Sequence, residues 1–169
     1  RAGHWPRTGY FGRSFMVKGK AVGVLGLGHI GKKVAARASA FGANVIYYDI
    51  VRQPEQEEQF GYRFVDFDTL LKESDIFTIH CPLNEETRGM IGAAQFAKMK
   101  PTAMLINTAR GPIVEEAALV DALTTGKIAT AGLDTYEHEP LPKDHPLLTP
   151  DNVVARHDAG GNTRITTTT

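Results

Sequence analysis

The stretch "AVGVLGLGHIGKKVAARASAFGANVIYYD", residues 21–49, decides the fold. The apolar run at its start indicates a buried strand, and the amphipathic run after it indicates a helix that ends at Gly42. Gly26, Gly28 and Gly31 lie where the strand gives way to the helix, in a G-x-G-x-x-G arrangement. A strand, a glycine turn and a helix in this order are typical of a dinucleotide-binding unit.

The three glycines have separate physical roles. Gly26 permits the sharp turn, Gly28 leaves room for a pyrophosphate to approach the backbone, and Gly31 lets helix and strand pack closely. The helix presents free backbone N–H groups and the positive end of its dipole to the phosphates. Glycine-rich turns also occur in flavoproteins and methyltransferases, so the motif alone does not establish the chemistry.

The cofactor preference depends on the end of the second predicted strand. Asp49 lies near the spacing of about 20 residues at which an acidic side chain binds the adenosine ribose. A carboxylate there accepts hydrogen bonds from ribose hydroxyls and repels a 2′-phosphate, which favours NAD over NADP. Arg52 lies close by in the sequence and keeps NADP open as an alternative.

Short apolar runs alternate with amphipathic segments along the rest of the chain, which predicts an α/β fold with a doubly wound parallel sheet (Rossmann) covered on both faces. We expect Asp66 or Asp68 to cap the second helix. The first helix is expected to bury Ile30, Val34, Ala38 and Phe41. Strands are predicted over 20–28, 44–49, 61–65, 75–82, 103–109, 128–134 and 152–157, and helices over 29–42, 68–74, 92–99 and 115–127.

Composition narrows the class of protein. The 169 residues carry 19 basic and 19 acidic side chains, so no net field attracts nucleic acid or an anionic membrane. The apolar runs are too short to predict a membrane span. Cys81 is the only cysteine, which excludes an internal disulfide and favours a reducing, cytoplasmic location. No spacing of ligand residues indicates a metal site.

Polar stretches follow the last four predicted strands. They read "HCPLNEETRGMIG", "NTARG", "DTYEHEP" and "RHDAGGNT". Ligands of such sheets bind beyond the carboxyl ends of the strands, so we expect these loops to converge on one ligand.

These stretches give the chain a resemblance to the D-isomer-specific 2-hydroxyacid dehydrogenases. It extends over about residues 17–163 and includes "GVLGLGHIGKKVA", "HCPLNEETRGMI", "INTARGPIVEEAAL", "GLDTYEHEPLP" and "NVVARHDAGGNT", in the family's order. The resemblance implies an oxidoreductase that transfers a hydride between NAD(H) and a small D-2-hydroxy acid or 2-keto acid. It does not say which acid.

The resemblance also implies a catalytic set of Arg110, Glu139 and His157. Arg110 would bind the substrate carboxylate and carbonyl oxygen, although a surface ion pair with Glu115 or Glu116 is the alternative. His157 would act as general acid and base, and Glu139 would orient its ring. Arg156 and Asp158 flank the histidine, where members commonly carry Thr-Pro before it and an apolar residue after it.

Cofactor contacts follow from the same resemblance and from the glycine motif. Asp134 would contact the nicotinamide amide, and Pro82 would form a wall of its pocket. The expected cofactor-binding residues are Gly26, Gly28, His29, Ile30, Gly31, Asp49, His80, Cys81, Pro82, Thr87, Thr108, Ala109, Arg110, Asp134, His157 and Gly160.

Family members are longer, with a separate substrate domain. We therefore expect a lead-in segment over 1–18, an NAD-binding domain over 19–160, and over 161–169 either the return to a substrate domain or a disordered tail. Aromatic residues in the lead-in, Trp5, Tyr10 and Phe11, are candidates for a homodimer contact. The chain alone is expected to bind NAD(H) but to turn over 2-keto acids poorly or not at all.

Two other classes of function remain open at this point. Some transcriptional corepressors share the dehydrogenase frame and respond to NADH by changing partners, so an NADH-responsive binding module is one alternative. A methyltransferase or another nucleotide-binding sheet, with Asp49 on a different ribose, is the other.

Overall fold

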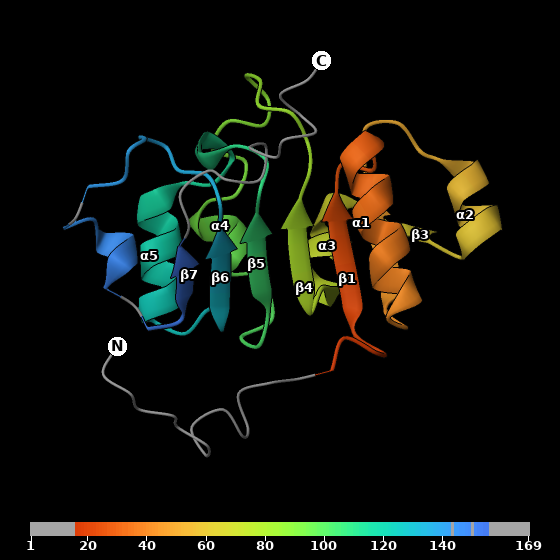
Figure 1. The fold of residues 1–169 in the computed structure, drawn as a ribbon, viewed down its shortest axis with the longest axis horizontal. Coiled ribbons are helices and arrows are strands. Elements are labelled where there is room, and N and C mark those ends of the chain that lie inside the picture. The colour runs from red at the N-terminus through yellow and green to blue at the C-terminus, as the bar shows by residue number, and fades with distance from the viewer. Residues whose placement is uncertain (1–15, 143, 150, 156–169) are drawn as a thin grey trace, which may run out of the picture.

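A computed structural model describes residues 16–142, 144–149 and 151–155. These residues form a seven-stranded sheet in the order β3-β2-β1-β4-β5-β6-β7, and all neighbouring strands run parallel (Figure 1). The strands are β1 (Ala21–Leu25), β2 (Asn44–Tyr48), β3 (Arg63–Phe64), β4 (Ile76–Ile79), β5 (Met104–Asn107), β6 (Thr130–Leu133) and β7 (Val153–Ala155).

The strand order confirms the doubly wound sheet. The chain moves outward from β1 to β2 and β3, then returns to β4 on the other side of β1 and continues outward to β7. The order therefore reverses between β1 and β4, where the loops that follow the two strands diverge. A crevice at the carboxyl end of such a switch point is the usual ligand site of this architecture.

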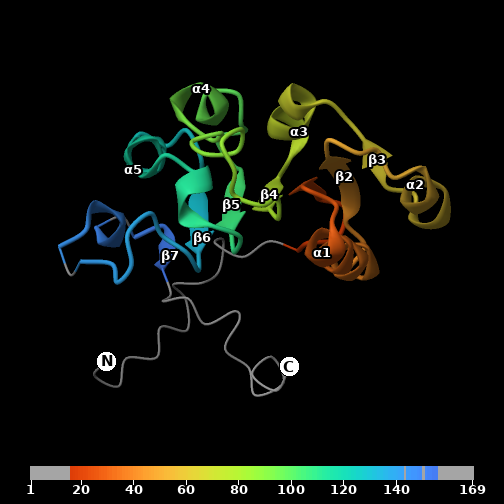
Figure 2. The ribbon, with the colours of Figure 1, turned by 90° about the horizontal axis from the view of Figure 1, so that it is seen from above.

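Helices lie on both faces of the sheet (Figure 2). They are α1 (His29–Ala40), α2 (Pro54–Phe60), α3 (Phe67–Glu73), α4 (Ala93–Phe96) and α5 (Glu116–Thr124), with short 3-10 turns η1 (Gly111–Ile113) and η2 (Pro146–Leu148). Helices α3, α4 and α5 share one face, and α1 lies on the other face against β1 and β2.

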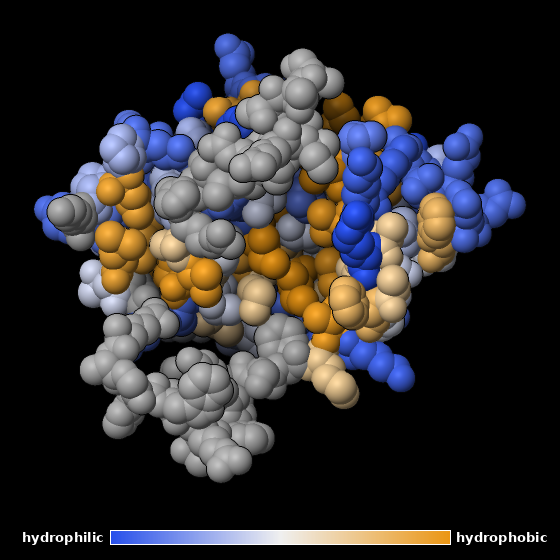
Figure 3. Space-filling view, viewed as in Figure 1, coloured by the Kyte–Doolittle hydropathy of each residue, from blue (hydrophilic) through white to orange (hydrophobic). Residues whose placement is uncertain are grey.

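The core has two parts, one on each side of the sheet. The larger part packs Leu70, Phe96 and Leu119 of α3, α4 and α5 against the strands, and the smaller part packs Ala35 of α1 and Tyr47 of β2. Among the described residues, no helix covers β5–β7 on the α1 side. Hydrophobic side chains gather over the strands of that face (Figure 3). Helices thus lie on both faces, as predicted, although those of the described residues cover the α1 side only at β1 and β2.

The buried face of α1 differs from the prediction. The structure buries Gly31 and Ala35, whereas Ile30 is 63% exposed and Phe41 is 72% exposed. The reason is that α1 approaches the sheet closely: a β-carbon at position 31 would overlap the carbonyl oxygen of Gly26. Small residues therefore form the contact, and the larger apolar residues point elsewhere.

The other elements follow the predictions with shorter bounds. Asp66 caps α3, since its Oδ1 accepts a hydrogen bond from the Thr69 amide at 2.8 Å. β1, β2, β4 and β5 end earlier than predicted because the residues beyond their carboxyl ends form the loops that line the cleft. α2 was not predicted: its sequence "PEQEEQF" has no apolar period and none of its residues is buried. No helix in the described part of the chain could cross a membrane.

Candidate functional site

The glycine loop after β1 is shaped by close backbone packing. Gly26 has a φ of +91°, and a β-carbon there would lie 2.7 Å from the Cys81 amide nitrogen. Only glycine meets both demands, because L side chains rarely adopt this φ. The β1–α1 turn therefore fits against the residues that follow β4, while Gly31 packs α1 onto the turn.

Gly28 differs from its two neighbours in the motif. A β-carbon there would meet no atom within 4 Å, so nothing in the protein's own packing requires glycine. Gly28 is also the N-cap of α1, and no side chain caps the helix start or places an acid in its first turn. The start of α1 is therefore uncapped by any side chain and has open space beside Gly28, as an anion-binding helix start requires.

Asp49 is held at the end of β2 beside this loop. Its Oδ2 accepts a hydrogen bond from the Leu27 amide at 2.6 Å, and its Oδ1 accepts one from the Val51 amide at 3.2 Å. The carboxylate therefore connects the end of β2 to the glycine turn. It also lines a hollow of about 280 Å³ together with Gly26, Gly28 and residues that follow β4.

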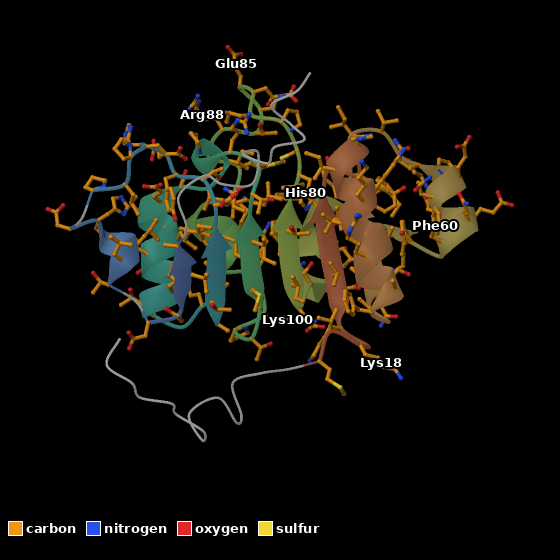
Figure 4. The ribbon with its side chains drawn as sticks, viewed as in Figure 1. Lys18, Phe60, His80, Glu85, Arg88 and Lys100 are labelled. Atoms are coloured by element: carbon orange, nitrogen blue, oxygen red, sulfur yellow. The ribbon has the colours of Figure 1, made fainter. Side chains whose placement is uncertain are left out.

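A second hollow, of about 600 Å³, continues toward β5. It is lined by His29 and Ile30 at the start of α1 and by residues 108–110 after β5. The two hollows share His80, Cys81 and Pro82, so together they form one cleft across the switch point. Figure 4 shows His80 at the carboxyl end of the sheet, with Lys18 and Lys100 at the opposite end.

Residues after β4 form the floor of the cleft. The His80 Nε2 lies 2.9 Å from the Thr78 Oγ1, and burial lowers the pKa of His80, so its ring is neutral at neutral pH. Thr87 organises the loop: its hydroxyl donates to the Pro82 carbonyl oxygen at 2.7 Å and accepts from the Asn84 amide at 2.9 Å. Thr87 thus shapes the wall of the cleft from within.

Burial also raises the pKa of Cys81 to about 11. The thiolate fraction at a given pH below 9 is then about 100-fold lower than for a thiol at the reference value of 9.0. We expect the folded chain to react with a thiol reagent about 100-fold more slowly than the unfolded chain, with a rate that keeps rising above pH 9. Because Cys81 is the only cysteine, a chromogenic disulfide reagent reads this site alone. Equal rates in native buffer and in denaturant would contradict the buried, neutral thiol.

The loop that carries Arg110 is fixed by a buried amide. Asn107, at the end of β5, is 1% exposed; its Nδ2 donates to the Arg110 carbonyl oxygen at 2.9 Å and its Oδ1 accepts from the Ala109 amide at 3.1 Å. Both ends of the loop are therefore held by one side chain. The Arg110 side chain is exposed, and its Nη1 donates to the Ala109 carbonyl oxygen at 2.7 Å.

The loop after β6 packs directly on the Arg110 loop. A β-carbon at Gly111 would overlap the backbone carbonyl of Tyr136, so the two loops touch through their backbones. The Glu139 Oε1 accepts from the Tyr136 amide at 3.0 Å. Glu116, the alternative partner for Arg110, instead accepts from the Glu137 amide at 2.7 Å and lies 3.2 Å from the His145 Nε2.

The structure therefore brings together most of the expected site. Gly26, Gly28, Asp49, residues 80–82 and residues 108–110 line the cleft, whereas Gly31 is buried under the glycine turn. Asp134 directly follows β6, where its amide donates to the Asn107 carbonyl oxygen at 3.1 Å. His157 and Gly160 lie outside the described residues, as do Arg156, Asp158 and the aromatic residues of the lead-in. The described residues contain no cluster able to hold a metal ion.

Three residues that shape the site were not assigned from the sequence. Asn107 and Gly111 lie within the quoted "INTARG" stretch, and their position beside a tight loop was the only available signal. Glu116 acts across a large sequence separation, which no local pattern reveals. All three position loops and do not line the cleft.

Comparison with known proteins identifies the class. Residues 1–157 match the family described as "D-isomer specific 2-hydroxyacid dehydrogenase, NAD binding domain". The chain belongs to this family. Membership favours a dehydrogenase domain over the methyltransferase alternative and agrees with the parallel sheet and its cleft.

Individual relatives agree with this assignment. The chain is 47% identical over 164 residues to D-3-phosphoglycerate dehydrogenase of Archaeoglobus fulgidus, covering 97% of the chain and 31% of that protein. It is 46% identical over 170 residues to glyoxylate/hydroxypyruvate reductase B of Klebsiella pneumoniae, covering 98% of the chain and 52% of that protein. The chain thus spans about half, or less, of these relatives.

A solved structure shows the same fold. The crystal structure of D-lactate dehydrogenase with NAD+ from Lactobacillus jensenii superposes with a TM-score of 0.83 at 42% identity. The match covers 89% of this chain and 48% of that one.

The residues present fit NAD. Gly28 opens onto space at an uncapped helix start, where a pyrophosphate can reach backbone N–H groups. The Asp49 carboxylate lines the hollow beside Gly28, and the cleft extends from there to Arg110. The chain is therefore an NAD-binding domain of this family.

Proposed function

We propose that this chain, over residues 19–160, is the cofactor domain of an oxidoreductase acting on small D-2-hydroxy acids and the corresponding 2-keto acids. When bound, NAD(H) supplies or accepts the hydride at the substrate carbon. The observation that carries the proposal is the single cleft that joins the glycine loop to Arg110 across the switch point.

Arg110 holds the substrate. Its planar guanidinium donates two parallel hydrogen bonds, which suits a carboxylate next to a carbonyl oxygen. Asn107 fixes the backbone on both sides of this residue, so the Arg110 side chain extends from a fixed point in the lining of the cleft. The position of Arg110 in the cleft supports this role.

His157 and Glu139 handle the proton. The imidazole protonates the carbonyl oxygen during reduction and takes the hydroxyl proton during oxidation, a two-way role that suits an ordinary pKa of about 6.5. The Glu139 carboxylate stabilises the charged ring and orients it. Support comes from the family membership and from the position of Glu139 in a loop packed against the Arg110 loop.

Turnover with a panel of 2-keto acids tests this function. In the longer enzyme that carries this domain, we expect NADH oxidation with glyoxylate, pyruvate or hydroxypyruvate. Arg110→Lys keeps the charge but loses the two-pronged geometry, so kcat/KM should fall by about 100-fold or more. The NADH dissociation constant, measured by fluorescence titration, separates any contribution of Arg110 to the cofactor from its role toward the substrate. An unchanged kcat/KM would contradict the role of Arg110.

The domain by itself should bind NADH without efficient turnover, because a substrate domain closes such sites against water. We further propose that residues 1–18 contribute a homodimer contact, that residues 161–169 begin the return to the substrate domain, and that the protein works in the reducing cytoplasm. Sedimentation velocity of the chain with and without residues 1–18 measures the first of these. Rapid NADH oxidation by the isolated chain would contradict the need for a second domain.

A further inference from the structure

Beside the cleft, a carboxylate of α2 holds the side chain of Arg52. The Arg52 Nε donates to the Glu57 Oε1 at 2.9 Å, and its Nη2 donates to the Glu57 Oε2 at 2.8 Å. The guanidinium carbon also lies 5.6 Å from the centroid of the Phe64 ring. Both carboxylate oxygens and one ring thus fix the guanidinium toward β3, and Arg52 lines neither hollow of the cleft.

A buried side chain of β2 in turn holds Glu57 in place. The hydroxyl of Tyr47, a fully buried residue of β2, donates to the Glu57 Oε1 at 2.8 Å and accepts from the Gln53 amide at 2.8 Å. The Arg52 hydrogen bonds, with the Tyr47 hydroxyl assisting, lower the pKa of Glu57 to about 2. The carboxylate is therefore ionised throughout the neutral range, and its side chain is only 18% exposed.

Arg52 and Glu57 follow closely in the sequence after Asp49, the residue that we assign to the adenosine ribose. Asp49 directly follows β2 and precedes Arg52 by three residues, and an arginine near this point is the usual partner of a 2′-phosphate. A guanidinium is the side chain best suited to bind phosphate oxygens in pairs. Among the described residues that line the hollow at Asp49, none is lysine or arginine.

We propose, resting on the assignment of the cleft to NAD, that Glu57 is a specificity-determining residue. By holding the Arg52 guanidinium against β3, it withholds a cation from the 2′ position of the adenosine ribose. Discrimination against NADP then has two parts. Asp49 repels the 2′-phosphate, and Glu57 keeps Arg52 from binding it.

A purely structural role for the pair makes a different prediction. Glu57 joins α2 to Tyr47, so it could serve only to dock that helix. In that case its replacement lowers the free energy of unfolding and leaves the ratio of NADPH to NADH affinity unchanged. The two roles are therefore separated by cofactor binding, measured directly by calorimetry with the chain itself.

The experiment uses Asp49→Asn as its background. Asparagine keeps an oxygen that accepts from the Leu27 amide. It removes the negative charge, whose repulsion of the 2′-phosphate would mask any gain in NADPH affinity. Adding Glu57→Gln keeps an oxygen for the Tyr47 hydroxyl but loses the ion pair with Arg52. We expect the NADPH dissociation constant to fall by about tenfold, the scale of a charge-assisted hydrogen bond, and the NADH constant to change by less than about twofold.

Two further variants give the controls. Glu58→Gln removes the same charge from an exposed neighbour in α2 and should leave NADPH affinity nearly unchanged. Adding Arg52→Gln to the double variant should abolish the NADPH gain. Thermal unfolding of each variant confirms that it is folded.

The outcomes separate the inference from the cofactor assignment. An NADPH gain that depends on Arg52 supports the role of Glu57. No gain, an equal gain in Glu58→Gln, or a gain that survives Arg52→Gln would overturn it while NADH binding persists. Failure of the wild-type chain to bind NADH would overturn the cofactor assignment and, with it, this inference.

Discussion

Gly28→Asp is expected to abolish NADH binding without unfolding the protein. The backbone at Gly28 has a φ of −74° in the extended region, and a β-carbon there meets no atom within 4 Å. Aspartate is also a preferred N-cap, so thermal stability should stay the same or rise slightly. Its carboxylate, however, would face the pyrophosphate, and like charges about 4 Å apart near a surface repel by about 4 kcal/mol. We expect the NADH dissociation constant to rise by about 100-fold or more.

Gly28→Asn is the matched control for this prediction. Asparagine has nearly the same shape and the same preference for the N-cap but carries no charge. It should weaken NADH binding much less than aspartate does, and the difference isolates the electrostatic part. If calorimetry shows equal NADH affinity for wild type and Gly28→Asp, the pyrophosphate does not lie at this helix start.

Gly31→Ala is expected to destabilise the fold, although helix propensity predicts the opposite sign. Alanine in a helix interior is favoured over glycine by about 1 kcal/mol. Here its β-carbon would overlap the carbonyl oxygen of Gly26, and overpacking of this kind costs about 1 to 3 kcal/mol. Because the Gly26 carbonyl belongs to the backbone and cannot rotate away as a side chain can, α1 must move away from the turn. The difference between the two effects is a net loss of up to about 2 kcal/mol in the free energy of unfolding, and we expect weaker NADH binding.

Ala36→Gly in the same helix measures how much helix propensity alone changes the free energy of unfolding. Ala36 is exposed, so its replacement should cost about 1 kcal/mol through propensity alone. Denaturant unfolding of both variants gives the comparison. If Gly31→Ala instead raised the free energy of unfolding by as much as Ala36→Gly lowers it, α1 would not pack closely on the glycine turn.

The sequence was most informative where local chemistry and topology agree. The glycine motif predicted the β1–α1 turn, and alternating apolar and amphipathic runs predicted the parallel sheet. Because the carboxyl ends of parallel strands share one edge, the loops after β1, β4 and β5 could be expected to meet. The structure places Gly26, His80 and Arg110 along one cleft at this edge.

The errors have physical causes that no local pattern contains. Periodicity predicted that Ile30 and Phe41 face the sheet, but the close approach of α1 selects its small residues instead. α2 lacks an apolar face and was invisible to the same reasoning. It is joined to β2 by a polar contact, in which the Tyr47 hydroxyl donates to Glu57.

Long-range contacts between loops were also not predicted from the sequence. Asn107 holds the Arg110 loop from inside the sheet edge, and Glu116 reaches the Glu137 amide from α5. Such pairings depend on the distance between loops in the folded chain. The roles of His157 and Gly160 stay predictions, since both lie outside the described residues.

The most direct test of the account follows backbone amide chemical shifts while NADH is added to the wild-type chain. If the uncapped start of α1 binds the pyrophosphate, the largest shifts should occur at residues 28–31, with smaller ones at Asp49 and at residues 80–82. Largest shifts at the separate hollow between α5 and η2, lined by Val120, Pro146 and Asn152, would contradict it.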